Sequence, residues 1–565
     1  MIARLSSIRA VLRKLADQTL VYADWDGFAE MALPGDAPAG LLRWCSRMVM
    51  TSALSDGLWF VPYLVIVPAT AFTVLVFVPR RWRFRWFSVA AAVLAALGSV
   101  FLPVMGVSAG VWLESECSYP VMNPLGMLAA AWLFIPLRGF AVRSGAASFA
   151  AVCVMLAMLY VPLGAYALVP LVALAALRLA KRRPFAPSCV GTALFAAALA
   201  MAAVPFSARF VYGDTALPIV WRASHAFRPR WNGAVDVGPQ LEQEDAVKKG
   251  DFGKVLAIAD LQTASSRPPL RMSVAYRILA QYRLGRLPDD IFKYPMPTSH
   301  AGTDAEELMM DGYVLLFNYG FLMPARREIY EIASMRGWQP CHFRMLGDIA
   351  AITGELALAC RYYRQLSRCP MNGSFARRRL DALERSDASA FSDIAEIADM
   401  HRIWQMFYKT QPTAFFSTEQ NVESFIYNHF RALKSAPDMM VRMFVTAMLL
   451  ECEVEPLLNN TGLIGSLGAA GRAAGAWPVP VQEAVIAHIA NLPEAERAAV
   501  AEKIPKDAIE PAAVRNFNEF FSRPQSMSLS NPFATTYFFY RAFLYPAGGN
   551  VRPSNAPSSY SVPEA

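Results

Sequence analysis

Hydrophobic residues form long uninterrupted runs in the first part of the chain and short periodic groups in the rest. A bilayer core about 30 Å thick requires roughly 20 apolar residues of helix. Four runs reach that length without a charged residue, and they are too uniformly apolar for surface helices. They cover residues 57–78, 87–113, 117–137 and 184–208. We therefore expect a membrane domain in the first 211 residues.

A fifth run, residues 144–177, is too long for one membrane span. Its 34 uncharged residues would form a helix of about 51 Å. Pro162 and Gly164 interrupt it, because proline lacks a backbone donor and glycine loosens the chain. We predict a hairpin of two short helices, which brings the total to about six helices. A re-entrant hairpin, which turns back before crossing, is the alternative.

From residue 240 the pattern changes to amphipathic helices of ordinary length with short turns between them. Each predicted first helix contains or ends near a glycine, which suits the left-handed conformation that ends a helix. These glycines are Gly250, Gly320 and Gly354. The predicted pairs cover 242–261 with 270–284, 306–319 with 323–335, and 340–353 with 356–366.

Helix pairs of about 34 to 40 residues in series are typical of tetratricopeptide-like solenoids, which bury a core by stacking. An irregular all-helical domain is the alternative. We therefore predict an all-α protein, a polytopic transmembrane helical bundle followed by a soluble helical-repeat domain. Its predicted parts are an N-terminal amphipathic or juxtamembrane segment, the transmembrane domain, the soluble domain and a disordered tail, at residues 1–56, 57–211, 212–546 and 547–565.

Charge predicts which way the membrane domain faces. The loops after the first, third and hairpin segments contain arginine and lysine but no acid, whereas the loop after the second contains Glu114 and Glu116 and no base. Basic loops stay in the cytoplasm. The last span then delivers the soluble domain outward, which in a diderm bacterium means an inner-membrane protein with a periplasmic domain. If residues 144–177 formed one helix, that domain would be cytoplasmic.

The N-terminus fits this scheme poorly. Six crossings that end outside also place Met1 outside, yet Arg4, Arg9 and Arg13 favour the inside. Either the first residues form an amphipathic helix on the membrane surface, which we favour, or an upstream span is missing from this chain.

Composition excludes several classes of function. The chain of 565 residues carries a net charge of +8, but the excess lies beside apolar runs, so topology explains it without a nucleic acid. The eight cysteines contain no CxxC pair and the six histidines are dispersed, so we expect no metal site. No glycine pattern for a nucleotide occurs, and we expect no cofactor.

The sequence Gly106-Val107-Ser108-Ala109-Gly110 spells the GxSxG of a hydrolase. That motif works only on a strand-to-helix turn above a sheet. Here it lies inside an apolar span, where the two glycines form a GxxxG that favours close helix packing.

One acidic pair remains as candidate chemistry. Asp24 and Asp26 lie shortly before the first clear span, where paired carboxylates could serve as a general base and a metal ligand. In that outline the chain is similar to membrane glycosyltransferases of the GT-C class, which use lipid-linked sugars. A solvated juxtamembrane segment is the simpler interpretation, and the span that should precede such a loop is absent.

Several strings in the soluble domain resemble a family of uncharacterised multi-spanning membrane proteins from Bacteroidetes with a domain of unknown function. They are residues 282–294 (YRLGRLPDDIFKY), 319–326 (YGFLMPAR), 337–340 (GWQP) and 478–484 (PVPVQEA). The resemblance implies an inner-membrane protein with a helical-repeat domain and brings no catalytic residues. In the first string, Leu287-Pro288-Asp289-Asp290 predicts a turn that caps the next helix, with Phe292 and Tyr294 packed behind it.

The sequence favours a membrane-anchored scaffold of the cell envelope, with the lipid bilayer and a protein or envelope polymer as partners. Enzymatic activity is left open, and a GT-C-like glycosyltransferase is the alternative. A transporter is a poorer hypothesis, because the spans contain almost no charge to mark a substrate path.

Overall fold

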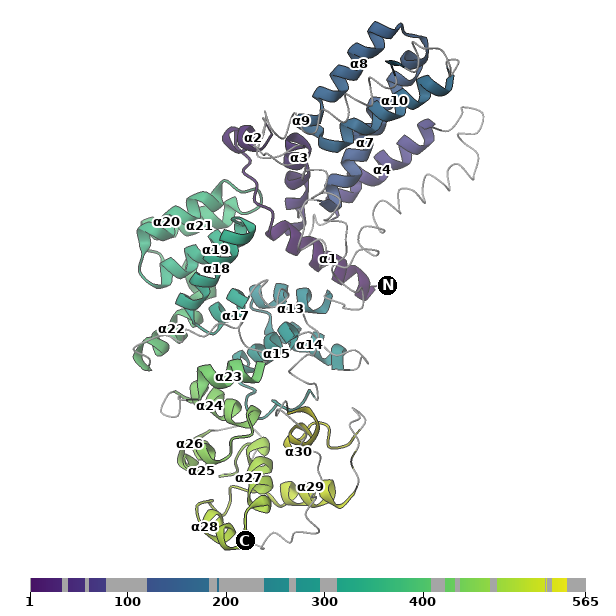
Figure 1. Cartoon of the computed structure of the whole chain (residues 1–565). Helices are drawn as coiled ribbons and strands as arrows, with labels where there is room; N and C mark the ends of the chain where they lie inside the picture. Colours follow the sequence, from purple (N-terminus) through teal and green to yellow (C-terminus); the bar gives the residue numbers. More distant parts are fainter. Residues whose placement is uncertain are drawn as a thin grey trace. The chain divides into compact units, whose positions relative to one another are not determined.

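The structure is a computed structural model, in which every regular element of the described residues is a helix (Figure 1). This confirms the all-α prediction for that part of the chain. The described residues are 2–32, 39–55, 60–77, 119–181, 191–192, 238–263, 271–294, 312–407, 422–431, 437–467, 475–523, 525 and 531–545.

Contacts divide the chain into two compact units. Unit 1 contains residues 1–238 and 337–390, and unit 2 contains residues 239–336 and 391–565. Residues 337–390 therefore group with the N-terminal half rather than with the remainder of the predicted soluble domain. Each unit is described by itself below.

The helices of unit 1 fall into an N-terminal group, an apolar group and a group that belongs to the helical pairs. The first group is α1 (Ile2–Asp17), α2 (Trp25–Ala32), α3 (Gly40–Thr51) and η1 (Ser52–Leu54). The second is α4 (Val61–Phe77), α7 (Tyr119–Arg143), α8 (Ala146–Met158), α9 (Tyr160–Leu163), η2 (Gly164–Ala167) and α10 (Leu168–Lys181). The third is α19 (Pro340–Ile352), α20 (Leu356–Ser367) and α21 (Gly373–Arg385).

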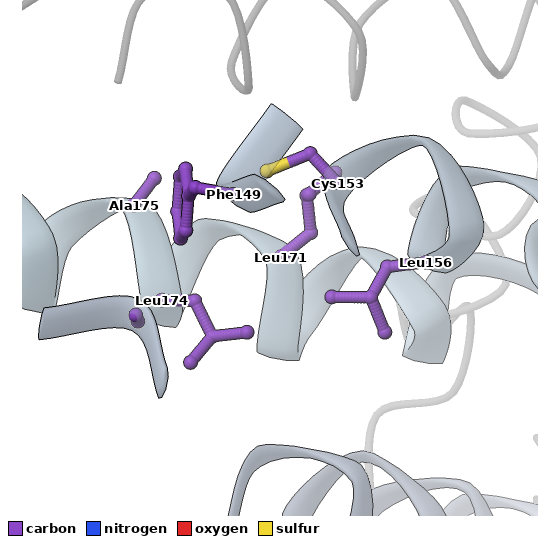
Figure 2. Close-up of a cluster of buried hydrophobic side chains, with 7 residues drawn as sticks. Phe149, Cys153, Leu156, Leu171, Leu174 and Ala175 are labelled. Atoms are coloured by element: carbon purple, nitrogen blue, oxygen red, sulfur yellow. The ribbon is translucent and has the colours of Figure 1, made fainter. Parts of the chain in front are cut away.

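The long run 144–177 folds back on itself at the expected place. Helix α9 ends at Leu163, and Gly164 has a φ of 62°, which a side chain would disfavour. Helix α10 then packs against both α8 and α7. Figure 2 shows the buried core between them, in which Phe149 and Cys153 of α8 meet Leu171 and Leu174 of α10.

Arg178 closes the open end of this hairpin. Its Nη1 donates to the carbonyl oxygens of Ala141 (2.9 Å) and Ser144 (3.2 Å), and its guanidinium lies 4.4 Å from the centre of the Phe149 ring. These carbonyls belong to the end of α7 and the turn that follows it. The end of α10 and the start of α8 therefore lie at the same end of the helix group.

The opposite end of the hairpin contacts α3. The amide of Ala39 donates to the carbonyl oxygen of Val161 (3.0 Å), and a Cβ on Gly164 would lie 2.8 Å from that of Ala39. Leu42 and Met122 complete a small buried cluster there. Helix α3 thus covers the hairpin turn at the end away from Arg178.

Two stretches, Pro124–Arg143 and Tyr160–Lys181, are long and apolar enough to cross a membrane, and Ala146–Met158 is a shorter apolar helix. The predicted span 87–113, with its GxSxG, and nearly all of 184–208 lie outside the described residues. The predicted tail 547–565 lies outside them too. The polytopic bundle of about six helices is therefore not confirmed.

Helix α1 at the N-terminus is buried on one side. Leu12, Leu15 and Ala16 are at most 1% exposed, and the helix packs on α3 and η1. The predicted helix is therefore present, with these apolar residues against the protein.

Unit 2 also consists of short helices. They are α13 (Gly238–Lys248), α14 (Phe252–Thr263), α15 (Arg271–Arg283), α17 (Gly312–Asn318), α18 (Leu322–Arg336), α22 (Ala395–Phe407), α23 (Val422–Phe430), α24 (Asp438–Leu450), α25 (Glu455–Leu458), α26 (Thr461–Ser466), α27 (Val479–Asn491), α28 (Glu494–Ala501), α29 (Pro511–Ser522), α30 (Tyr537–Phe539) and η6 (Tyr540–Leu544). The 3-10 helix η4 (Ala388–Ile394) spans the boundary between the units.

The same turn recurs along the helical pairs of both units. At Gly250, Gly320 and Gly354 the backbone is left-handed, and the next residue donates its amide to the carbonyl five residues back. This double turn satisfies the last carbonyls of a helix. Gly285 and Ser386 have it as well, so that five such turns follow one another 32 to 35 residues apart. The turn at Gly250 separates α13 from α14, so the single helix predicted over residues 242–261 is wrong and the range forms two helices.

Helices α19 and α20 approach each other closely at Gly347. A Cβ there would lie 2.5 Å from the Tyr363 ring, whose hydroxyl donates to Oδ1 of Asp348 (2.7 Å). Arg379 of α21 pairs with the same carboxylate at 3.4 Å, and both charged groups are buried. One tyrosine and one ion pair therefore connect three helices.

Residues 286–294 form successive turns, as predicted, and the residues that the turn was expected to cap lie outside the described ranges. Leu287, which precedes a cis peptide bond to Pro288, is buried together with Phe292 and Tyr294. Phe292 packs on Tyr540, with 4.7 Å between the ring centres. The packing that the sequence predicted behind this turn is present.

Gly347→Val should destabilise the helical part by roughly 2 kcal/mol, because overpacking a tight contact usually costs between about 1 and 3 kcal/mol. The measurement is denaturation of the purified chain followed by far-ultraviolet circular dichroism. Gly253→Val is the matched control, since only the Asp251 carboxylate lies within 4 Å of the site. Equal effects of the two changes would contradict the close packing of α19 on α20.

Candidate functional site

The predicted acidic pair lies at the start of α2. Asp24 precedes this helix and Asp26 is in its first turn. Asp24 Oδ2 accepts a hydrogen bond of 2.6 Å from Nε of Arg368, which follows α20. The structure thus joins the pair to a cation from a distant part of the sequence, and the spacing of the acids contains no sign of that partner.

The backbone and an aromatic ring strengthen this junction. The amide of Ala23 donates to the carbonyl oxygen of Arg368 (3.2 Å), and the guanidinium lies 4.4 Å from the centre of the Tyr22 ring. The hydrogen bond from Asp24 raises the pKa of Arg368, and the charge of Asp26 adds to that effect. Arg368 is therefore a permanent cation beside both acids.

Helix α3 supports the extended residues before α2 from the other side. Trp44 Nε1 donates to the carbonyl oxygen of Tyr22 (3.4 Å), and Arg47 donates to that of Leu20 (3.2 Å). Phe28 packs on Trp44 and on Trp25, which is 70% exposed. Residues 20–26 are thus fixed between α3 and the end of α20.

This junction can hold a charge in place more readily than it can transfer a proton. The carboxylate of Asp24 already accepts a hydrogen bond from the guanidinium of Arg368, so one of its oxygens is occupied by a structural partner. In the described ranges no group of three or more His, Cys, Asp and Glu side chains is placed to hold a metal ion. The six cysteines in those ranges form no disulfide, and Cys117, Cys189, His225 and His300 lie outside them.

Two buried acids whose pKa values are raised were not singled out from the sequence. Glu328 of α18 is 4% exposed, and burial, followed by the charge of Glu331, raises its pKa to about 8. The amides of Tyr313 and Gly312 oppose this shift. Gly312 leaves room for the carboxylate, because a Cβ there would lie 2.5 Å from Oε1.

Glu483 of α27 is the second buried acid. It accepts from the amide of Tyr537 at 2.8 Å, and burial raises its pKa to about 7. Its place in Val481-Gln482-Glu483-Ala484-Val485, a run otherwise almost apolar, is the signal that could have identified it. Both acids belong to unit 2 and contact neighbouring helices, which indicates a role in packing.

Comparisons with known proteins identify a family but no activity. The model described as "Family of unknown function (DUF6057)" matches residues 238–544. No curated protein and no solved structure matches the chain. The resemblance inferred from the sequence is confirmed as a family of unknown function, and the match says nothing about organism or membrane spans.

Reversing the charges of the junction tests whether the ion pair holds residues 20–26 in place. Asp24→Arg and Arg368→Asp should each increase hydrogen exchange at the Ala23 amide. We expect a loss of at most about 1 kcal/mol, because the pair is partly exposed. The double variant should recover part of the protection. The control is Arg385→Asp, which changes a charge outside the junction. This role would be contradicted if hydrogen exchange at the Ala23 amide did not change in either single variant, or if the control increased it by the same amount.

Glu328 should make stability depend on pH. Since its pKa in the folded chain is about 8 against an ordinary value of 4.5, its protonated form is stabilising below pH 4.5. That contribution is lost as pH rises through about 8. Between pH 7 and 8, the midpoint of chemical denaturation should fall with rising pH in the wild type and stay level in Glu328→Gln. Below pH 7 the midpoint should still fall with rising pH in this variant, because Glu483 has a raised pKa of about 7. The exposed Glu502→Gln is the control, and a wild-type pH profile in Glu328→Gln would refute the assignment.

Proposed function

The chain belongs to DUF6057, a family of unknown function, and we propose that it is a membrane-anchored scaffold whose helical domain binds a protein or an envelope polymer. The observation that carries the proposal is the combination of an apolar helix group with a series of regularly spaced helix pairs. The former anchors the chain and the latter presents a surface.

Exposure of the apolar helices supports the membrane anchor. In the most apolar 18-residue stretch of Pro124–Arg143, only 17% is buried inside the protein. In the corresponding stretch of Tyr160–Lys181, the buried share is 39%. Met127, Trp132, Met158 and Val172 are each between 47% and 70% exposed. A core helix of a soluble protein would cover such residues, whereas lipid covers them in a membrane.

Charge supports an outward position for α1–α3 and for the helical pairs of unit 1. Arg178 lies at one end of the apolar group, near the ends of α7 and α10 that carry Arg143 and Lys181. Helix α3 covers the other end, at Gly164. If the basic end is cytoplasmic, α3 lies outward. Such a protein would be a multi-pass inner-membrane protein with its C-terminal domain in the periplasm.

The junction at Arg368 agrees with an even number of crossings. Because Asp24 and Arg368 are in contact, residues 24 and 368 lie on the same side of any membrane that the chain crosses between them. The six predicted crossings satisfy this condition, and five would violate it.

The helical pairs favour a tetratricopeptide-like repeat. Turns 32 to 35 residues apart match the period of about 34 residues of that repeat. Gly347, Ala359 and Tyr363 pack where small and aromatic residues join the two helices of such a unit. Stacked repeats of this kind bind partners over extended surfaces, which is why we infer a scaffold.

The glycosyltransferase hypothesis stays a prediction. Among the described residues, the contact of Asp24 with Arg368 gives Asp24 a structural role and does not favour a catalytic one. Loss of an envelope glycan in Asp24→Ala and Asp26→Ala at unchanged protein level would be needed to revive it.

Cross-linking in intact cells tests the scaffold. The full chain with a C-terminal tag should stay in carbonate-washed membranes and give discrete adducts that map to the helical domain. Gly347→Val, which perturbs the packing of α19 on α20, should reduce these adducts, whereas Gly253→Val should preserve them.

Each part of the proposal can fail separately. Extraction by carbonate would reject the membrane anchor, and the absence of adducts from retained protein would reject the scaffold. Alkaline phosphatase, which is active only outside the cytoplasm, should be active when fused after Ser386 and inactive when fused at Arg182. The reverse pattern would reject an outward position of the helical domain.

A further inference from the structure

Helix α20 and the first two turns of α21 carry a one-sided charge, and the acids of α21, Asp381 and Glu384, lie beyond these turns. Between residues 356 and 380 every charged side chain is an arginine, and no acid occurs. Arg379 is buried with Asp348. The remaining guanidinium groups face solvent wholly or in part. They belong to Arg361, Arg364, Arg368, Arg377 and Arg378.

Three of these arginines share one side of α20. Arg361, Arg364 and Arg368 are spaced three, four and seven residues apart, which places their side chains in one row. Arg377 joins the row at its C-terminal end. A Cβ on Gly373 would lie 3.3 Å from Nη1 of Arg377 and 3.2 Å from the carbonyl oxygen of Ser367. We name Arg361, Arg364, Arg368 and Arg377 the arginine face.

The arginine face points toward the segment that precedes the apolar helices. Arg368 contacts Tyr22, Ala23 and Asp24 there. Because Arg361 lies almost directly above Arg368 on the helix, two turns or about 10 Å away, it looks in the same direction. Asp24 neutralises one guanidinium, and the excess of positive charge persists along the rest of the row.

The junction lies close to the end of the apolar helices. Ala39 contacts the hairpin turn at Val161 and Gly164. Trp44, which holds Tyr22, is five residues further along α3, or about 7 Å. The headgroup region of one leaflet extends over a similar distance. Trp25, 70% exposed beside Phe28, is the residue type that prefers this interface.

We propose that the arginine face binds the phosphate groups of anionic phospholipids in the leaflet next to α3. This inference rests on the proposed membrane anchor. Guanidinium groups bind phosphate through two parallel hydrogen bonds and keep their charge at any physiological pH. A row of them at the depth of the headgroups fits a lipid surface better than an extended polymer, because the adjacent exposed residue is a tryptophan.

Lipid binding to the purified full chain tests the proposal. The chain in neutral detergent is titrated with phosphatidylglycerol or phosphatidylcholine, and bound lipid is counted by native mass spectrometry. Wild type should prefer phosphatidylglycerol. The triple variant Arg361→Gln, Arg364→Gln and Arg377→Gln should lose affinity for it on the order of a hundredfold, or about fivefold for each arginine. Affinity for phosphatidylcholine should not change.

The control variant removes the same charge elsewhere. Arg327, Arg402 and Arg523 are between 61% and 72% exposed, and their replacement by glutamine should leave the lipid preference intact. Equal losses in both triple variants, or no preference in wild type, would overturn the proposal. Displacement of the lipid by soluble polyphosphate, with tighter binding of the polymer, would overturn it in favour of an anionic polymer site.

The membrane anchor is judged separately from lipid selectivity. A chain that stays in carbonate-washed membranes but shows no preference for phosphatidylglycerol would refute the arginine face alone. A chain that carbonate extracts would refute the anchor on which both depend.

Discussion

The guanidinium of Arg178 and the two carbonyl groups it binds determine the course of the apolar part of the chain. A charge among apolar helices is costly unless hydrogen bonds satisfy it, and the partners of Arg178 are the carbonyls of Ala141 and Ser144. The end of α10 must therefore return to the end of α7. The hairpin turns at Gly164 on the far side, where α3 covers it. One cation thus gives the helix group a basic end and an opposite end that contacts the N-terminal helices.

That opposite end is where distant parts of the sequence meet. Residues 20–26 lie between α3 and the end of α20, held by Trp44 on one side and Arg368 on the other. Both sides of this contact belong to unit 1, in which residues 337–390 group with the N-terminal half of the chain. The contact changes the meaning of Asp24, because a carboxylate that accepts from a guanidinium already has a structural partner. If the apolar group lies in a membrane, the same contact brings a row of arginines to its surface.

The sequence predicted local structure best where the backbone conformation favours one residue type. Gly250, Gly320 and Gly354 were predicted to end helices, and all three have a left-handed backbone. Gly285 also has a left-handed backbone, but the sequence was interpreted there only as a turn and not as the end of a helix. Ser386 and Cys452 adopt this conformation without being glycine. Since side chains disfavour it, surrounding packing must impose it there, and no sequence pattern announces that.

The sequence by itself determined the helical class, the apolar runs, the break at Pro162 and Gly164, and the turns between helical pairs. These features depend on residues within a few positions of each other, so that spacing and residue type report them. Tertiary structure alone decided that Arg178 leaves the basic loop cluster to become buried, that Asp24 pairs with Arg368, and that Glu328 and Glu483 hold raised pKa values. Desolvation and ion pairing depend on groups brought together from distant positions. The order of residues along the chain does not record that proximity.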